Sequence, residues 1–312
     1  MQIPTGFNNQ TLEKYTGLAS FFSKLAEPQF VELKTPENHA RVIAKCEWGN
    51  LAGTIKAKVA LAMIWKLLDD YDGDLSDLTV LEYSGGGLSL ALAELCHELG
   101  IQAVLVLMEV TPKSIIQRLE ELGAHVILTK KERGFWGVME EAMEISKQNP
   151  NWKFLYQHQN TANFEFHKAT TGQEIIDANI GEVSAWVASI GTGGTLTGVF
   201  DKLKEHYPNV QLHTNMPAEM PYATDEPSNS LPKFSGSGGL GCGMKQKFVE
   251  QFEDNVSEHH LVSFDEAKEA MFDYYKQYGE VIGSSAAANY KVAMNIASRM
   301  NPEEIVLTVF PS

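Results

Sequence analysis

Along this chain, apolar β-rich stretches alternate with stretches in which apolar residues recur at helical spacing. From about Thr54 to Tyr71, for example, Val59, Met63 and Leu67 fall on one helical face. The order of such stretches is typical of a parallel sheet covered by helices on both faces. For the first half, the pattern predicts strand Ala40–Trp48, helix Thr54–Tyr71, strand Leu78–Tyr83, helix Leu88–Leu99, strand Ala103–Met108, helix Pro112–Leu122 and strand His125–Leu128.

The alternation resumes in the second half and is interrupted once, by the Pro-, Gly- and Ser-rich stretch Met216–Gly243. We therefore predict an α/β fold of two lobes, residues 1–155 and 156–312, each a mainly parallel sheet flanked by helices, with a ligand bound where they meet. Whether the first forty residues pack on the second lobe is left open. The elements predicted here are strand Lys153–Tyr156, helix His167–Ala178, strand Ala185–Ile190, helix Thr195–His206, strand Val210–His213, helices Phe264–Tyr278 and Ser284–Met300, and strand Ile305–Phe310.

Composition narrows the class of protein. With 312 residues, 44% hydrophobic and 21% charged, the chain is typical of a globular protein. No apolar run approaches the roughly 20 residues that a bilayer requires, so no membrane span is expected. The net charge of −15 disfavours nucleic acid as a partner. A small anionic ligand remains possible because backbone N–H groups can hold a phosphate against an unfavourable net charge.

Cysteine usage and the amino terminus indicate the compartment. Cys46, Cys96 and Cys242 are widely spaced and form no C-x-x-C pair, which favours a reducing compartment and argues against a zinc cage. No metal site is expected. The start of the chain lacks the basic-then-apolar pattern of a signal peptide, so we expect a cytoplasmic protein.

The segment Gly191-Thr192-Gly193-Gly194-Thr195 lies between a predicted strand and an amphipathic helix. Glycines allow a tight turn that aims several N–H groups at one anion at the helix N-terminus. A plain glycine turn with a threonine cap would leave the same pattern. The segment is neither a P-loop nor a full Gly-x-Gly-x-x-Gly motif, because Leu196 stands where the third glycine would be, which weakens a nicotinamide-dependent oxidoreductase as an interpretation.

A second motif, Asn50-Leu51-Ala52-Gly53-Thr54-Ile55-Lys56, places a lysine in the first turn of a helix. Positive dipole ends there disfavour the ammonium form, which suits an amine nucleophile or base. By itself, Lys56 is better explained as a solvated surface lysine. Together with the glycine turn, it suggests a phosphate-bearing aldehyde cofactor held as a Schiff base.

These motifs resemble those of the fold-type II pyridoxal-phosphate enzymes, in particular the cysteine synthase and cystathionine β-synthase group. The lysine segment is similar to their Asn-x-x-Gly-Ser/Thr-x-Lys motif, and Gly191–Thr195 to their phosphate loop. Gln157–Asn163, continuing to Ile175, and Ile282–Ala287 resemble two further stretches, in the family's order. The resemblance covers roughly residues 40 to 312.

The resemblance implies a role for each matching residue. Lys56 would carry pyridoxal 5'-phosphate and later move the substrate's α-proton, Ser284 would hydrogen-bond the pyridine nitrogen, and Gln157 would help hold the substrate carboxylate. The cofactor's phosphate would rest on Gly191, Thr192, Gly193, Gly194 and Thr195.

The chain departs from the family in the substrate loop, typically Thr-Ser-Gly-Asn-Thr-Gly. A gapless alignment places Ser84-Gly85-Gly86-Gly87-Leu88-Ser89 there, so that Gly87 replaces an asparagine that contacts the cofactor and Leu88 replaces a threonine. The substrate-binding residues expected from this alignment are Ser84, Gly85, Gly86 and Leu88. Either the loop is remodelled for a larger substrate, or the cofactor chemistry has been weakened or abandoned. We favour the first, because Lys56, the phosphate loop and Ser284 all persist.

The activity implied by the resemblance is β-elimination or β-replacement on an amino acid with a β-leaving group, such as O-acetylserine or O-phosphoserine, through an α-aminoacrylate. A homodimer is implied as well. The alternative is a catalytically degenerate binding or regulatory protein that keeps the fold. Cys242, in a glycine-rich segment similar to one near the family's active site, could be an accessible thiol or an inert one.

Overall fold

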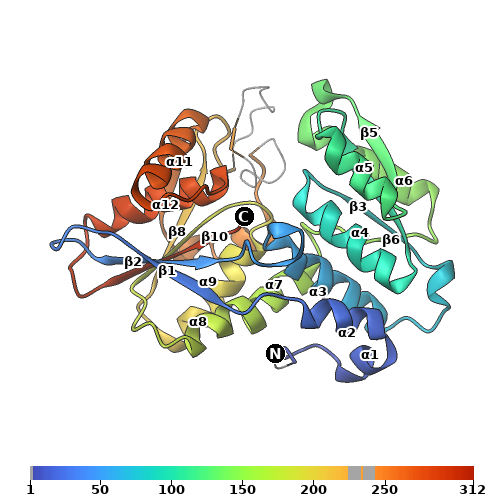
Figure 1. The fold of residues 1–312 in the computed structure, drawn as a ribbon, viewed down its shortest axis with the longest axis horizontal. Coiled ribbons are helices and arrows are strands. Elements are labelled where there is room, and N and C mark those ends of the chain that lie inside the picture. The colour runs from blue at the N-terminus through green and yellow to red at the C-terminus, as the bar shows by residue number, and fades with distance from the viewer. Residues whose placement is uncertain (1–2, 224–232, 235–242) are drawn as a thin grey trace. The chain divides into compact units, whose positions relative to one another are not determined.

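The computed structural model describes residues 3–223, 233–234 and 243–312, and the chain divides into two compact units (Figure 1). The first unit comprises Met1–Ala26 and Asn50–Phe166, and the second Glu27–Gly49 and His167–Ser312. The sequence pattern suggested a single boundary near residue 155. The chain instead passes between the units three times, because the strands formed by residues 27–49 pair with the carboxyl-terminal strand.

The first unit is built on a four-stranded, fully parallel sheet with the strand order β5-β4-β3-β6. The amino-terminal helices α1 and α2 belong to it, as do helices that follow each strand. Its elements are α1 (Asn9–Lys14), α2 (Thr16–Ser23), α3 (Lys56–Asp69), β3 (Thr79–Tyr83), α4 (Gly87–Leu99), β4 (Gln102–Met108), α5 (Lys113–Glu121), β5 (His125–Thr129), α6 (Gly134–Gln148), β6 (Lys153–Phe154) and α7 (Thr161–His167).

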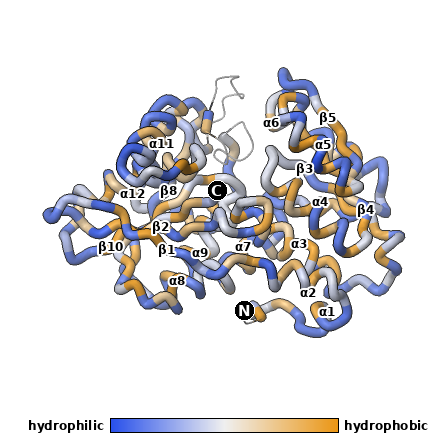
Figure 2. The backbone as a smooth tube through the Cα atoms, in the orientation of Figure 1, coloured by the Kyte–Doolittle hydropathy of each residue, from blue (hydrophilic) through white to orange (hydrophobic). Residues whose placement is uncertain are grey.

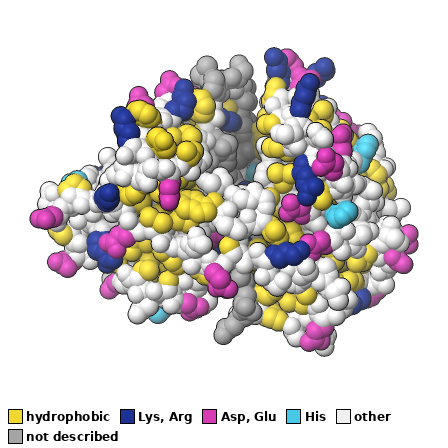
Figure 3. Space-filling view, in the orientation of Figure 1, with side chains coloured by type: hydrophobic (Ala, Val, Ile, Leu, Met, Phe, Trp, Pro, Cys, Tyr) yellow, Lys and Arg dark blue, Asp and Glu magenta, His cyan; other side chains and the backbone are white. Residues whose placement is uncertain are grey.

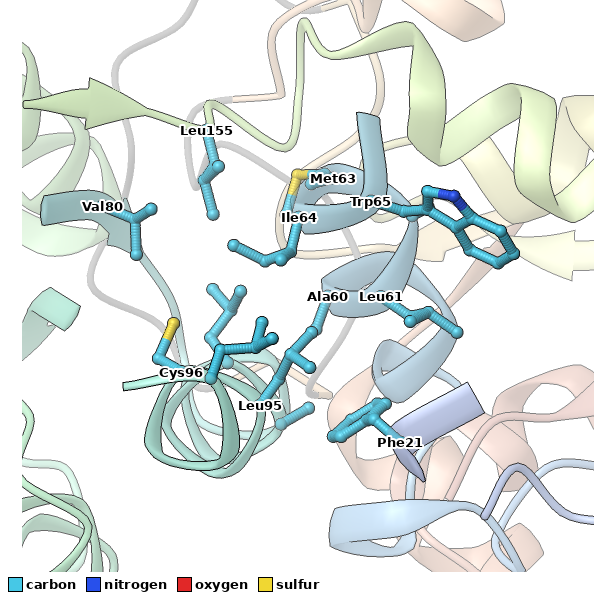
Figure 4. Packing of buried hydrophobic residues seen from close by; sticks show 14 of the residues in the cluster. Phe21, Ala60, Leu61, Met63, Ile64, Trp65, Val80, Leu95, Cys96 and Leu155 are labelled. Atoms are coloured by element: carbon cyan, nitrogen blue, oxygen red, sulfur yellow. The ribbon is translucent and has the colours of Figure 1, made fainter. Parts of the chain in front are cut away.

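The core of the first unit forms around α3, which buries nearly every residue from Ala57 to Trp65. Figure 4 shows Met63 and Ile64 of this helix near Val80 and Leu155, with Cys96 and Leu95 of α4 facing them. Trp65 is fully buried and donates its indole N–H to the Asn8 carbonyl at 3.0 Å. A helix buried on nearly all sides is held in one position, so the residue that begins it, Lys56, has a fixed starting point.

The second unit is built on a six-stranded sheet with the order β1-β2-β10-β7-β8-β9. The edge strand β1 is antiparallel to β2, and all other neighbours are parallel. Its elements are β1 (Gln29–Leu33), β2 (Arg41–Cys46), α8 (Gln173–Asp177), β7 (Ala185–Ser189), α9 (Gly194–His206), β8 (Gln211–Pro217), α10 (Lys247–Glu250), β9 (Val256–Val262), α11 (Phe264–Tyr278), α12 (Ser284–Ala297) and β10 (Ile305–Phe310).

The second unit buries its own cluster of hydrophobic residues; Figure 2 colours the backbone by hydropathy. All six residues of the central strand β10 are buried. The amphipathic helix α11 buries Ala267, Ala270 and Tyr274 and leaves its polar side in solvent. A charged pair lies deep in this unit: Lys45 and Glu47 are each 1% exposed and lie 2.7 Å apart, and Lys45 also pairs with Glu174 at 2.7 Å.

The predicted fold class is confirmed: both sheets are mainly parallel and are packed against helices. Strand β10 and helix α11 begin and end at the predicted residues. The structure adds α1, α2, β1, α6, α7, α10 and β9, and extends β8 to Pro217, into the stretch predicted as a long connection. Cys242 and most of the neighbouring glycines lie outside the described residues.

Charge and hydropathy on the surface agree with the composition. In the face drawn in Figure 3, acidic and basic side chains are interspersed. Within residues 3–223, 233–234 and 243–312, no helix combines the length and the apolar character needed to cross a membrane.

Candidate functional site

Lys56 begins α3 directly after a tight turn in the first unit. Ala52 and Gly53 take left-handed φ values of +56° and +64° in this turn, a conformation that costs a residue with a Cβ about 1 kcal/mol or more. The Lys56 N–H donates to Thr54 Oγ1 at 3.3 Å, and the side chain is half-buried. Burial lowers the pKa of Lys56 to about 8. About one amine in ten is then neutral at pH 7, against about one in three thousand for an unperturbed lysine.

The glycine loop lies between β3 and α4 and contacts the turn before Lys56. A Cβ built on Gly87 would lie 3.0 Å from Thr54 Cγ2. Gly87 therefore packs closely against Thr54 of the lysine motif. A Cβ on Gly85 or on Gly86 would meet nothing within 4 Å. The loop backbone therefore borders open space on one side.

The side chain of Ser84 hydrogen-bonds the backbone of this loop. Its hydroxyl oxygen accepts hydrogen bonds from Gly86 N at 3.0 Å and from Ser89 N at 3.3 Å. Gly86 has a φ of +148°, which side chains rarely allow. Leu88, in contrast, is 2% exposed and belongs to the hydrophobic core of the first unit, so any contact that it makes with a ligand falls to its backbone.

Gln157 supports the loop from the neighbouring strand end. Its side-chain amide donates to the Tyr83 carbonyl at 2.8 Å, and its backbone N–H donates to Glu82 Oε2 at 3.2 Å. Glu82 is fully buried, and this burial raises its pKa to about 8 in spite of the hydrogen bonds that it accepts. Sequence reasoning did not single out Glu82 or Tyr83. Their position at the carboxyl end of a parallel strand, where ligands of α/β folds bind, was the available signal.

His158 is a buried, hydrogen-bonded histidine. Its ring stacks on Tyr83 with centroids 5.5 Å apart, and its Nδ1 lies 2.5 Å from the tyrosine hydroxyl. Burial and the positive charge of Lys56 lower the pKa of His158 to about 3, so the ring is neutral at physiological pH. The electrostatic effect of Lys56 also places this ring in the surroundings of the lysine.

In the second unit, the glycine turn follows β7 and begins α9. Gly193 is the N-cap of α9 with a φ of +85°, and Thr192 Oγ1 accepts a hydrogen bond from Gly194 N at 3.2 Å. A Cβ on Gly193 would lie 2.6 Å from Val249 Cγ2, so a larger residue does not fit. The N-terminus of a helix of this length, with its unpaired N–H groups and positive dipole end, is suited to an anion.

A chain of hydrogen bonds fixes the last residue of the turn. Thr195 Oγ1 lies 3.0 Å from His167 Nε2, and His167 Nδ1 lies 2.9 Å from Thr171 Oγ1. His167 is completely buried. His167 and Thr171 are four residues apart in one continuous helical stretch, whereas Thr195 begins α9, so only the contact between His167 and Thr195 depends on the tertiary structure.

Ser284 begins α12 in the same unit and is half-buried. The helix is attached to the end of β7, from which the glycine turn starts. Asn289 of α12 accepts a hydrogen bond from Ser189 Oγ at 2.8 Å and donates to the Val309 carbonyl at 2.7 Å. Helix α12, which begins with Ser284, and strand β7, which leads into the glycine turn, are therefore packed against each other.

The sequence-derived candidates thus form two groups. The first unit holds Lys56, Ser84–Leu88 and Gln157, and the second unit holds Gly191–Thr195 and Ser284. The first group offers a partly neutral amine, and the turn that precedes it contacts an open glycine loop. The second offers an anion cradle and a hydroxyl group at a helix start.

Comparison with known proteins identifies the family. The family described as "Pyridoxal-phosphate dependent enzyme" matches residues 28–312. A probable cysteine synthase of Bacillus subtilis is 32% identical over 276 residues, which are 87% of this chain and 86% of the relative. A cysteine synthase of Staphylococcus aureus is 30% identical over 278 residues, 88% of this chain and 87% of the relative.

Solved structures share the fold. An O-acetylserine dependent cystathionine beta-synthase from Helicobacter pylori superposes with a TM-score of 0.83 at 24% identity, covering 94% of both chains. An O-ureido-L-serine synthase superposes with a TM-score of 0.82 at 23% identity, covering 94% of this chain and 90% of the other. From the extent and identity of these matches, the chain belongs to the family of pyridoxal-phosphate dependent enzymes and, within it, to the fold-type II cysteine synthase group.

Proposed function

We propose that this protein is a pyridoxal-phosphate dependent enzyme that replaces the β-substituent of an amino acid of the O-acetylserine or O-phosphoserine type. The observation that carries the proposal is the half-buried Lys56, with its pKa lowered to about 8, directly after a turn that contacts the loop of three glycines through Thr54. Relatives called cysteine synthase support the same reaction class.

The glycine turn of the second unit fits the phosphate of the cofactor. A phosphate needs backbone N–H donors, and the turn supplies them at the start of α9, in a conformation that the left-handed φ of Gly193 allows. We assign the phosphate to Gly191–Thr195, with the hydroxyl groups of Thr192 and Thr195 as further donors.

Lys56 and Ser284 fit the other ends of the cofactor. A partly neutral amine can bond to an aldehyde carbon, and a serine hydroxyl can hydrogen-bond a pyridine nitrogen without placing a negative charge beside it. When bound, pyridoxal 5'-phosphate supplies an electron-withdrawing ring that acidifies the Cα–H of an attached amino acid.

The remaining residues of the first unit act on the substrate. We assign the substrate carboxylate to the backbone N–H groups of the Ser84–Leu88 loop, whose shape is fixed by Ser84 Oγ, and to Gln157 behind it. Lys56 Nζ takes the proton from the substrate's Cα, and a neutral amine near pH 8 is matched to that task. Gly85 and Gly86 border open space, so the loop backbone at these residues is not blocked by a neighbouring side chain within 4 Å of a Cβ.

Chemical mapping tests the role of Lys56. Cofactor-loaded protein is reduced with borohydride and digested, and the peptide that carries the cofactor's mass is identified. We expect the label on Lys56, and its loss in Lys56→Met. Lys113→Met is the matched control, because Lys113 also begins a helix but is exposed. A label on another lysine, or none, would contradict the proposal.

The substrate class is tested by turnover. O-acetylserine, O-phosphoserine and cysteine are added separately, with sulfide as nucleophile where needed, and product is measured together with the visible absorption of the cofactor. We expect turnover with one or more of the three. Cofactor binding without turnover of any of them would favour the alternative, a catalytically degenerate binding protein. That alternative is considered because Gly87 replaces an asparagine of the family.

We further infer a homodimer in the cytoplasm. The dimer is carried over from the family resemblance, and light scattering of the purified protein tests it. The compartment is supported by the two free, buried thiols of Cys46 and Cys96 within the part of the chain that the structure describes.

A further inference from the structure

Two imidazoles and a carboxylate meet on the outer strands of the second sheet, apart from the residues assigned above. His213 lies on β8, and Glu258 and His260 lie on the neighbouring edge strand β9. His213 pairs in register with Glu258, and Asn215 with His260. Residues two apart on a strand share a face, so Glu258 and His260 lie on the same face of β9. The register between β8 and β9 shifts between Leu212 and His213, and such irregularities change the direction of a side chain.

The ligand atoms are spaced as around one small cation. His213 Nδ1 lies 3.2 Å from His260 Nε2, and Glu258 Oε2 lies 3.9 Å from the first nitrogen and 3.4 Å from the second. These separations form a triangle whose corners are all about 2 Å from one central point, and Zn²⁺ binds imidazole nitrogen and carboxylate oxygen at roughly 2.0–2.2 Å. We propose that His213, Glu258 and His260 form a binding site for a divalent transition metal of the zinc class.

The surroundings of His213 orient it as a ligand. Its Nε2 lies 3.2 Å from Gln211 Oε1, an atom that can only accept, so Nε2 carries the proton. Nδ1 is then unprotonated, and its lone pair is available to a metal. Hydrogen bonds of this kind, from the second ring nitrogen to a neighbouring acceptor, hold metal-binding histidines in their tautomer.

One cation already faces the site and opposes the metal. Arg299 Nη2 donates to Glu258 Oε2 at 2.8 Å. Its guanidinium is half exposed, so it can turn away when a more strongly bound cation arrives. The competition predicts that removing Arg299 strengthens metal binding.

A metal here would join the edge strand β9 to β8. His213 is 5% exposed and is the most buried of the three ligands, whereas the Glu258 side chain is 41% exposed, so a metal ion can reach the site from solvent. The expectation of no metal rested on the spacing of cysteines, which does not bear on a set of histidines and a carboxylate. Three protein ligands leave a fourth position for water.

Cobalt binding tests the site in the full-length, cofactor-loaded protein without a histidine tag, after treatment with a chelator and in phosphate-free buffer. We expect one equivalent of Co²⁺ with visible d–d absorption, displaced by Zn²⁺. His260→Gln and Glu258→Gln should each weaken the affinity about tenfold or more, and Gln211→Leu about tenfold. Arg299→Met should tighten it several-fold.

His259→Gln is the matched control. His259 lies between the two proposed ligands of β9, but it is bound to Thr214 Oγ1 at 2.7 Å and points to the other face of the strand. Its change should leave the cobalt affinity within about twofold. Absence of saturable binding, or affinities that His260→Gln and Glu258→Gln leave unchanged, would overturn the proposal. Circular dichroism of each variant shows whether a loss of binding reflects unfolding.

Discussion

Replacing Gly193 with alanine should damage the second unit in two separable ways. The residue has a φ of +85°, where a Cβ costs about 1–2 kcal/mol. That Cβ would also lie 2.6 Å from Val249 Cγ2, a buried side chain that cannot move aside freely. Overpacking of this kind typically costs about 1–3 kcal/mol. We therefore expect Gly193→Ala to lower the free energy of unfolding by about 2–5 kcal/mol.

Two further variants separate the backbone cost from the clash. Gly279 has a similar φ of +74°, but a Cβ there meets nothing within 4 Å, so Gly279→Ala should show the backbone cost alone, about 1–2 kcal/mol. Val249→Ala removes the methyl group in the way. In the double variant, the loss should be smaller than the sum of the two single losses by about 1–3 kcal/mol.

Urea denaturation of the cofactor-free proteins, followed by their tryptophan fluorescence, measures these free energies; Trp186, whose indole N–H is bound to the Leu196 carbonyl of α9, contributes to that signal. Cofactor-free protein is used because a bound ligand would add its own stabilisation. If Gly193→Ala costs no more than Gly279→Ala, and the double variant is additive, the close packing of the glycine turn is refuted as the reason for Gly193.

Three other changes give independent tests. In the wild type, the unfolded chain releases the Glu82 proton near pH 4.5 and the folded chain near pH 8, so the free energy of unfolding falls as the pH rises from about 4.5 to about 8. Glu82→Gln lacks this proton, so its free energy of unfolding in urea denaturation should rise relative to that of the wild type by about 3 kcal/mol from pH 6 to pH 9. Equal pH dependence of the two proteins would contradict this. Lys45→Met should cost about 3–5 kcal/mol by leaving its two carboxylate partners uncompensated, and a neutral result would mean that the ion triad contributes no net stability. Gly87→Asn should cost about 1 kcal/mol by crowding Thr54, and Thr54→Ser should restore the loss in thermal denaturation; no recovery would exclude the contact as the cause.

The sequence was sufficient for the order and type of most elements. Helix α11 and strand β10 were predicted to the residue, because their apolar spacing and capping signals lie within the segments themselves. Helix α3 was placed with its ends two residues too wide, since a frayed end and a flanking turn have similar composition. The family resemblance was likewise readable from short motifs, and it is confirmed.

Elements that depend on distant partners were missed. Strand β1 is largely polar or half-buried and exists because β2 pairs with it, and β2 itself belongs to the second unit because it pairs with β10. Strand β9 alternates between half-buried and exposed residues, as an edge strand does, and its apolar signal is weak. The roles of Lys56, Gln157, Ser284 and the two glycine loops remain predictions.

By itself, the sequence determined which residues are adjacent along the chain, and hence the strands, helices, glycine turns and family motifs. Only the tertiary structure decided which side chains are surrounded by which others: the burial that lowers the pKa of Lys56 and raises that of Glu82, the Val249 methyl group that excludes a Cβ at Gly193, and the meeting of His213 with Glu258 and His260. The physical reason is that desolvation, close packing and ligand geometry depend on atoms supplied by segments far apart in the chain, whereas turn and helix signals act over a few residues.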